Sequence, residues 1–244
     1  GYTSTAATYT YSSSGGSWTG SSSIYLTKSS ATVYGFYPSA LTPAMNGTSS
    51  TVPVEIASAV TGFDVSGNTQ TDYMYATASG INKTSSTASL TFYHGLTELS
   101  FIVNKGLDFS GRGTLSAIIL TSSSSIAGSG TLSLADGTVS LTGSASTTIS
   151  LSGTTIINDY SETASDNVVA AVLVAPLGSS SPDNATLVLT IDGVEYTGTI
   201  TAPAWEAGNN YEYRVTISGG ELTIDSSVNI ADWTTTGPTD VDVS

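Results

Sequence analysis

The stretch Tyr211-Glu-Tyr-Arg-Val-Thr-Ile217 decides the fold class, because apolar and polar residues alternate along it. Every second side chain of a strand points to the same face, so Glu212, Arg214 and Thr216 lie on the face opposite the apolar residues. Such a strand has one buried and one solvated face. The same alternation recurs through most of the chain and helical periodicity is nearly absent, which predicts an all-β protein.

Two Asp-Gly pairs between alternating segments predict β-hairpins. Asp192-Gly193 separates residues 187–191 from 194–200, and Asp136-Gly137 lies between residues 132–134 and 139–141. Asp and Gly tolerate the positive φ angles that a two-residue hairpin turn requires.

Two apolar segments complete the strand prediction. Residues 168–174 are apolar throughout and precede Pro176, which indicates a strand buried on both faces or, alternatively, a short buried helix. Residues 90–103 read as one long strand whose apolar positions change parity. An extra residue at 95–98 would restore a single buried face, so we expect a β-bulge there.

The length of 244 residues suits two β-sandwich domains. Residues 104–113 contain three glycines and two of the five basic residues, a composition typical of a linker. We therefore predict one domain over residues 1–108 and a second over residues 109–244.

The charge excludes several partners. Nineteen acidic and five basic residues give a net charge of −14, and the basic residues are scattered along the chain. Nucleic acid and anionic membranes attract clustered Lys and Arg, so neither is an expected partner. The chain has no cysteine, which excludes disulfides, thiol chemistry and cysteine-bound zinc.

Catalytic, metal and cofactor sites are not predicted. His94 is the only histidine and shares strand parity with Leu90 and Phe92, so it points inward and has a structural role. No Gly-x-Ser-x-Gly elbow or phosphate loop accompanies it. The acids lie mainly at turns and on solvated faces, which disfavours a glycosidase pair. The chain is therefore interpreted as a protein without enzymatic activity.

Two weaker sites remain as alternatives. Residues 158–162 and 64–68 carry oxygen ligands without the spacing of a known calcium loop, so solvated turns are the simpler interpretation. The tryptophans, with thirteen tyrosines, could form a sugar-stacking platform, or they could fill the core. We predict that Trp205, Tyr213 and Trp233 belong to the packing of the second domain.

An ordered series of segments in the last eighty residues resembles the Mfa-like fimbrillins, subunits and accessory proteins of the type V pili of Gram-negative gut and oral anaerobes. These segments are Leu173-Val-Ala-Pro176, Trp205-Glu-Ala-Gly208, Tyr211-Glu-Tyr-Arg-Val215, Leu222-Thr-Ile224 and Ile230-Ala-Asp-Trp233. Upstream, Val33-Tyr-Gly-Phe-Tyr-Pro38 and Asp72-Tyr-Met-Tyr-Ala76 occur in the same order as in that family.

The resemblance implies two transthyretin-like β-sandwich domains in tandem, export as a lipoprotein precursor and assembly at the outer membrane surface. It further implies that other pilus subunits are the partners, joined by strand exchange after proteolysis behind a basic residue. No Lys or Arg precedes Lys28, and eleven residues follow Trp233. The sequence therefore leaves open whether the subunit forms the stalk, the tip or the anchor of a pilus.

The carboxyl-terminal tail is the candidate assembly strand. Val241 and Val243 alternate with Asp240 and Asp242, as in a half-buried inserted strand. A frayed acidic terminus is the alternative. The sequence thus predicts a fimbrial structural or tip adhesive subunit, with a host glycan or protein as a possible receptor. A carbohydrate-binding surface lipoprotein is the competing hypothesis.

Overall fold

The computed structural model describes residues 5–12, 14, 17–46, 49–63, 70–160, 167–177, 185–200, 204–225 and 229–233. All regular secondary structure in these residues is β-strand, which confirms the all-β prediction. No helix in this part of the chain has the length and apolar character needed to span a membrane.

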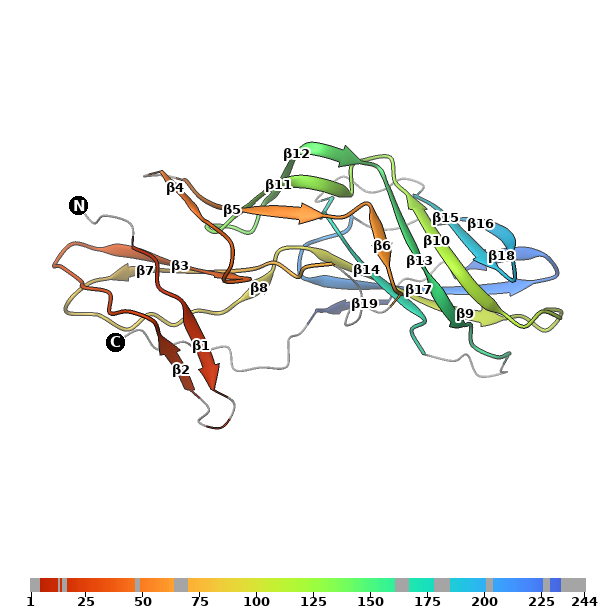
Figure 1. Ribbon diagram of the computed structural model, residues 1–244, viewed down its shortest axis with the longest axis horizontal. Coiled ribbons are helices and arrows are strands. Elements are labelled where there is room, and N and C mark those ends of the chain that lie inside the picture. The colour runs from red at the N-terminus through yellow and green to blue at the C-terminus, as the bar shows by residue number, and fades with distance from the viewer. Residues whose placement is uncertain are drawn as a thin grey trace.

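Two sheets enclose the larger hydrophobic cluster (Figure 1). The first sheet has five strands in the spatial order β16 (Val194–Ile200), β15 (Ala185–Ile191), β10 (Thr114–Thr121), β13 (Thr148–Ile156) and β6 (Ala59–Thr61). The second has the order β14 (Ala170–Val174), β9 (Thr97–Lys105), β17 (Asn209–Ser218) and β18 (Glu221–Ile224). Strand β19 (Asn229–Asp232) pairs with the first half of β17.

Two further sheets enclose a smaller hydrophobic cluster. One has the order β12 (Val139–Ser146), β11 (Ala127–Ser133), β5 (Ser49–Ile56) and β4 (Ala44–Asn46). The other consists of β3 (Ala31–Tyr37), β7 (Met74–Ile81) and β8 (Tyr93–His94). A separate hairpin of β1 (Tyr9–Ser12) and β2 (Ser17–Gly20) completes the strands of the described residues.

Strand β17 has the alternating burial that its sequence predicts. Tyr211, Tyr213, Val215 and Ile217 are buried, and the residues between them are partly exposed. The strand lies parallel to β9, an arrangement that the alternation alone does not reveal. The apolar face of β17 belongs to the larger cluster.

Both predicted hairpins form. Strands β15 and β16 pair from Ile191–Val194 outward, with φ angles of 50° at Asp192 and 80° at Gly193. These angles match a two-residue turn in which both central residues have positive φ. The β11–β12 turn is longer, and only Gly137 in it has a positive φ, of 77°.

The two predictions for apolar segments have different outcomes. Strand β14 is buried at every residue, so the strand prediction is confirmed and the helix alternative is wrong. The single bulged strand over residues 90–103 is wrong, because the chain forms β8 and β9 in two different sheets with a bend at Gly95–Leu96. The change of parity marks the passage of the chain from one sheet pair to the other.

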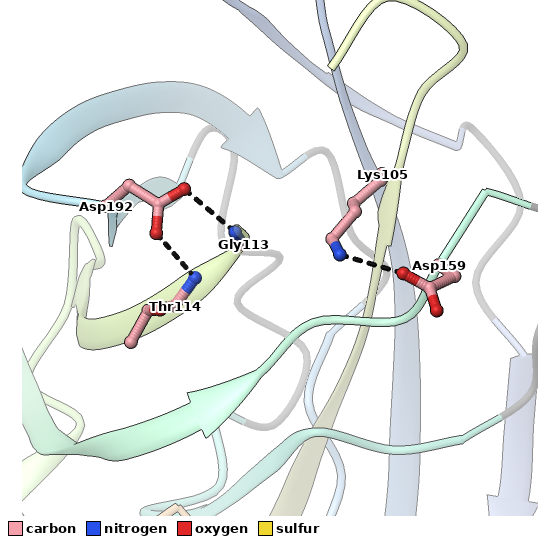
Figure 2. Close-up of polar contacts among 5 residues, drawn as sticks. All are labelled: Lys105, Gly113, Thr114, Asp159 and Asp192. Atoms are coloured by element: carbon pink, nitrogen blue, oxygen red, sulfur yellow. Dashed lines mark hydrogen bonds and ion pairs between the residues drawn. The ribbon is translucent and has the colours of Figure 1, made fainter. Parts of the chain in front are cut away.

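Side-chain contacts hold both ends of residues 104–113, the segment predicted to be a linker. The Asp192 carboxylate accepts hydrogen bonds of 2.8 Å from the backbone N–H groups of Gly113 and Thr114, as Figure 2 shows. The Lys105 ammonium forms an ion pair of 2.8 Å with Asp159. Residues 106–113 thus connect β9 to β10 within one sandwich.

Several strand pairs join residues on the two sides of the predicted boundary between residues 108 and 109. Strands β5, β6 and β9 precede that point and pair with β11, β13 and β17, which follow it. The physical reason is that each cluster needs strands from both halves of the chain to cover its apolar side chains. The two cores are therefore interleaved along the sequence.

Candidate functional site

The four side chains predicted to be structural form two contacting pairs. His94 ends β8 and stacks on Trp233, which directly follows β19. Trp205 precedes β17 and donates a hydrogen bond to Tyr213 in that strand. Both pairs involve the loop of residues 204–208, because Trp205 belongs to it and the Trp233 N–H bonds to its Gly208 carbonyl.

The His94–Trp233 pair joins the end of the described chain to the smaller cluster. The ring centroids are 3.8 Å apart with an interplanar angle of 11°, and Nδ1 of His94 lies 2.9 Å from an Asp72 carboxylate oxygen. His94 is 5% exposed, and its buried Nε2 has no hydrogen-bond partner among the described residues. His94 is thus packed between the Asp72 carboxylate and the Trp233 ring.

Strand β19 places Trp233 in this position. It pairs antiparallel with the first half of β17, with Tyr211 opposite Ile230. The Trp233 N–H donates to the Gly208 carbonyl at 2.8 Å, and the Gly208 N–H donates to the Leu96 carbonyl at 2.9 Å. The last described residues therefore close one edge of β17 and cover part of the smaller cluster.

The Trp205–Tyr213 pair is inside the larger cluster. The Trp205 indole donates to the Tyr213 hydroxyl at 2.7 Å, and burial raises the pKa of that hydroxyl. The Tyr211 hydroxyl donates to the Ala204 carbonyl at 2.6 Å and accepts from the Glu206 N–H at 2.9 Å. These bonds fix the loop against β17 and satisfy polar groups that would be costly to bury alone.

Sequence reasoning missed the polar partners of this region. Asp72 faces His94, and the Gln70 amide bonds both the N–H and the carbonyl of Leu173, each at 2.7 Å. Gln70 thus completes the outer edge of β14 as another strand would. A single Asp or Gln carries no local pattern that would reveal such a contact.

The sheets also leave unpaired edges. Strand β3 pairs with β7 alone, and β12 pairs with β11 alone, among the described residues (Figure 1). No charged side chain occurs in residues 29–54, which include β3, or in residues 137–158, which include β12. Uncharged edges are the ones that a further strand can join most readily.

The remaining candidates from the sequence have separate outcomes. Val241 and Val243 lie outside the described residues, as do Asp64–Asn68 of the weaker calcium loop. Asp159 of the other loop points into solvent and pairs with Lys105. No group of three His, Asp or Glu side chains within metal-binding reach occurs in the described part.

Comparison with known proteins gives consistent results. A family model described as fimbrillin-like matches residues 2–233. Two similar crystal structures are proposed cell adhesion proteins from Bacteroides ovatus and Bacteroides uniformis. The Bacteroides ovatus protein is 19% identical with a TM-score of 0.58, and the match covers 84% of this chain and 69% of that protein. The Bacteroides uniformis protein is 20% identical with a TM-score of 0.58, and the match covers 86% of this chain and 76% of that protein.

A third similar structure is a fimbrial protein from Bacteroides vulgatus, with 15% identity, a TM-score of 0.55 and coverage of 82% of this chain and 77% of its own. At these identities the likeness establishes the fold. None of the curated proteins matches this chain.

Proposed function

Since this chain belongs to the fimbrillin-like family, we propose that it is a structural or adhesive subunit of a fimbria on the bacterial cell surface, without enzymatic activity. The family match over residues 2–233 is the observation that carries this proposal. Its partners are then other pilus subunits, and an adhesive position would add a host glycan or protein as receptor.

The proposal includes two transthyretin-like sandwich units, export as a lipoprotein precursor and assembly at the outer membrane. Two separate hydrophobic clusters, each between two sheets, support the two units. The interleaved strand order means that the units are assigned by cluster and not by position in the sequence.

Strand donation is the proposed mode of assembly. The unpaired edge of β3 offers backbone N–H and carbonyl groups to an incoming strand, with no charged side chain in that strand. The tail with Val241 and Val243 is the proposed donor, and its alternation would bury two side chains per inserted strand. Backbone hydrogen bonds supply most of the contact because two valines bury little apolar area.

Two variants in the native host test this mode. Deletion of Pro238–Ser244 removes the donor, and Thr32→Lys places a charge in β3, where Thr32 is exposed. Both should shorten the fimbriae or leave monomers. Thr77→Lys is the matched control, because Thr77 is exposed on β7, which pairs with β3 and, at Met74 and Tyr75, with β8.

The outcomes separate the mode of assembly from the function. Fimbriae of normal length in both variants would exclude strand donation through the tail and β3. Immunogold labelling tests the broader proposal: a subunit that is absent from isolated fimbriae of the native host is not a fimbrial protein.

A further inference from the structure

We propose that a hollow beside the β1–β2 hairpin binds a neutral carbohydrate through the face of Trp18. The inference rests on the adhesive form of the proposed function, for which it names the class of receptor, and its test needs the folded chain and not an assembled fimbria. The hollow has a volume of about 460 Å³, within the usual range of small-ligand sites. The hairpin forms one wall, and the ends of β3 and β7 contribute Val33 and Ile81.

Three aromatic rings share one face of the hairpin. Tyr11 lies opposite Trp18 with ring centroids 5.3 Å apart, and Tyr9 lies opposite Gly20. A Cβ atom at Gly20 would lie 3.0 Å from the Tyr9 ring, so the Tyr9 ring packs closely over this part of β2. Tyr9 and Trp18 both line the hollow.

The lining is neutral throughout. It combines the Tyr9 and Trp18 rings and four aliphatic residues with hydroxyl groups, which come from Thr19, Ser21, Ser22, Ser23 and Ser86. No residue of the lining carries a charge that would pair with a charged ligand, and a fully apolar ligand would leave the hydroxyl groups unused. A pyranose matches this lining, because it presents an apolar face for an aromatic ring and hydroxyl groups for hydrogen bonds.

The indole of Trp18 has an unused donor. Its Nε1 atom is buried and has no hydrogen-bond partner among the described residues. Buried donors are nearly always paired, and no described residue pairs this one, so a ligand that brings an acceptor to the Trp18 indole would satisfy it. A sugar hydroxyl or ring oxygen is such an acceptor.

The test is titration of the full chain with methyl pyranosides of glucose, galactose, mannose and N-acetylglucosamine, followed by a neutral glycan array. In ¹H–¹⁵N spectra the three tryptophans give three indole signals. Trp18→Phe identifies the Trp18 signal by its disappearance. We expect this signal to shift saturably with a sugar, while those of Trp205 and Trp233 stay in place.

Variants then locate the site. Trp18→Ala should weaken binding at least about tenfold, since it removes both the stacking surface and the donor. Trp18→Phe keeps a ring and the hairpin packing, so it should weaken binding less. Tyr25→Ala is the control, because Tyr25 is 88% exposed and lies outside the hollow.

Three results would overturn the proposal. These are the absence of binding to every neutral glycan, unchanged affinity in Trp18→Ala, and a Trp18 indole signal that ignores a bound sugar. If the Trp18 signal shifts only with protein concentration, the hollow is occupied by a second copy of this chain and the carbohydrate assignment fails. None of these results depends on whether fimbriae form.

Discussion

The Tyr213 hydroxyl and the Trp205 indole share one hydrogen bond inside the larger cluster. Removing the oxygen in Tyr213→Phe leaves the indole N–H buried without an acceptor. We expect a loss of about 1–3 kcal/mol in the free energy of unfolding, the usual cost of an unsatisfied buried donor. Urea denaturation measures it. Tyr25→Phe removes an oxygen from a side chain that is 88% exposed and should change stability by less than about 0.5 kcal/mol.

A cost for Tyr213→Phe as small as that of the control would mean that the indole finds another acceptor. The structural role assigned to Trp205 and Tyr213 from the sequence would then need revision. Strand parity could predict the burial of Tyr213, because every second residue of β17 faces the core. It could not predict the bond to Trp205, which depends on how the loop of residues 204–208 folds back on the strand.

Stacking of Trp233 on His94 gives the second prediction. Trp233 is only partly buried, so Trp233→Ala should cost about 1–3 kcal/mol, less than a fully buried tryptophan. In a His94→Gln background the same change should cost about 0.5–1.5 kcal/mol less, because the stacked partner is already gone. A double-mutant cycle by chemical denaturation measures this difference.

Strictly additive effects in that cycle would show that the two rings do not stabilise each other. A stable His94→Gln variant that loses affinity for a ligand would contradict the structural role of His94. Parity placed His94 inward from the sequence alone. Its contacts with Asp72 and Trp233 join positions far apart in the chain, and no local pattern encodes them.

At the scale of elements, the β15–β16 hairpin also caps the start of β10. Hydrogen bonds from the N–H groups of Gly113 and Thr114 lower the pKa of the Asp192 carboxyl below its ordinary 3.8. A lowered pKa in the folded state stabilises the fold above pH 3.8, and this contribution is lost as the pH falls through the lowered pKa. The stabilisation is therefore present at neutral pH.

The third prediction follows from the lowered pKa of the Asp192 carboxyl. Asp192→Asn should lower the unfolding midpoint at pH 7, and its difference from the unmodified chain should shrink as the pH falls below 3.8. Thermal unfolding at several pH values measures the difference. Glu195→Gln, which removes an exposed carboxylate from the same hairpin, is the matched control. A pH-independent difference for Asp192→Asn would assign its effect to turn geometry alone.

Elements were predictable from the sequence where the signal is local. Asp192-Gly193 encodes a two-residue turn, and the alternation in β17 encodes one buried face. The split between β8 and β9 was not predictable, since a parity change fits both a bulge and a transfer to another sheet. Which of these occurs depends on partners such as β14 and β17, which lie more than sixty residues further along the chain.

For the whole molecule, composition suggested two domains but not how the chain is distributed between them. Each cluster takes strands from both sides of residue 108, because a sheet buries its apolar face against whichever sheet fits. The segment at residues 104–113 has the composition of a linker, yet Asp192 and Asp159 tie it within a sandwich. These contacts come from carboxylates far away in the sequence, so no local sequence pattern predicts them.

The two ends of the molecule differ in charge. Figure 1 places β1, β2, β3 and β7 at one end and β15, β16 and β18 at the other. Residues 1–54 and 73–97 contain no acid, and their only charges are Lys28 and Lys83. Near the other end the hairpins carry acids, which are Asp192, Glu195 and Glu221. Head-to-tail contact between copies therefore brings opposite charges together, although each chain carries −14.

The last prediction tests whether the ends meet in this way during the proposed assembly. Lys28→Glu and Arg112→Glu change the net charge equally, and both residues are exposed. Lys28 lies between β2 and β3, and Arg112 lies just before β10, whose first residues bond to the acidic β15–β16 hairpin. Lys28→Glu should slow association of the chain, whereas Arg112→Glu, which makes the acidic end more negative, should speed it. Light scattering at low ionic strength measures both rates, and added salt should reduce the difference. If both variants slow association equally, net charge alone governs the encounter and the ends do not steer it.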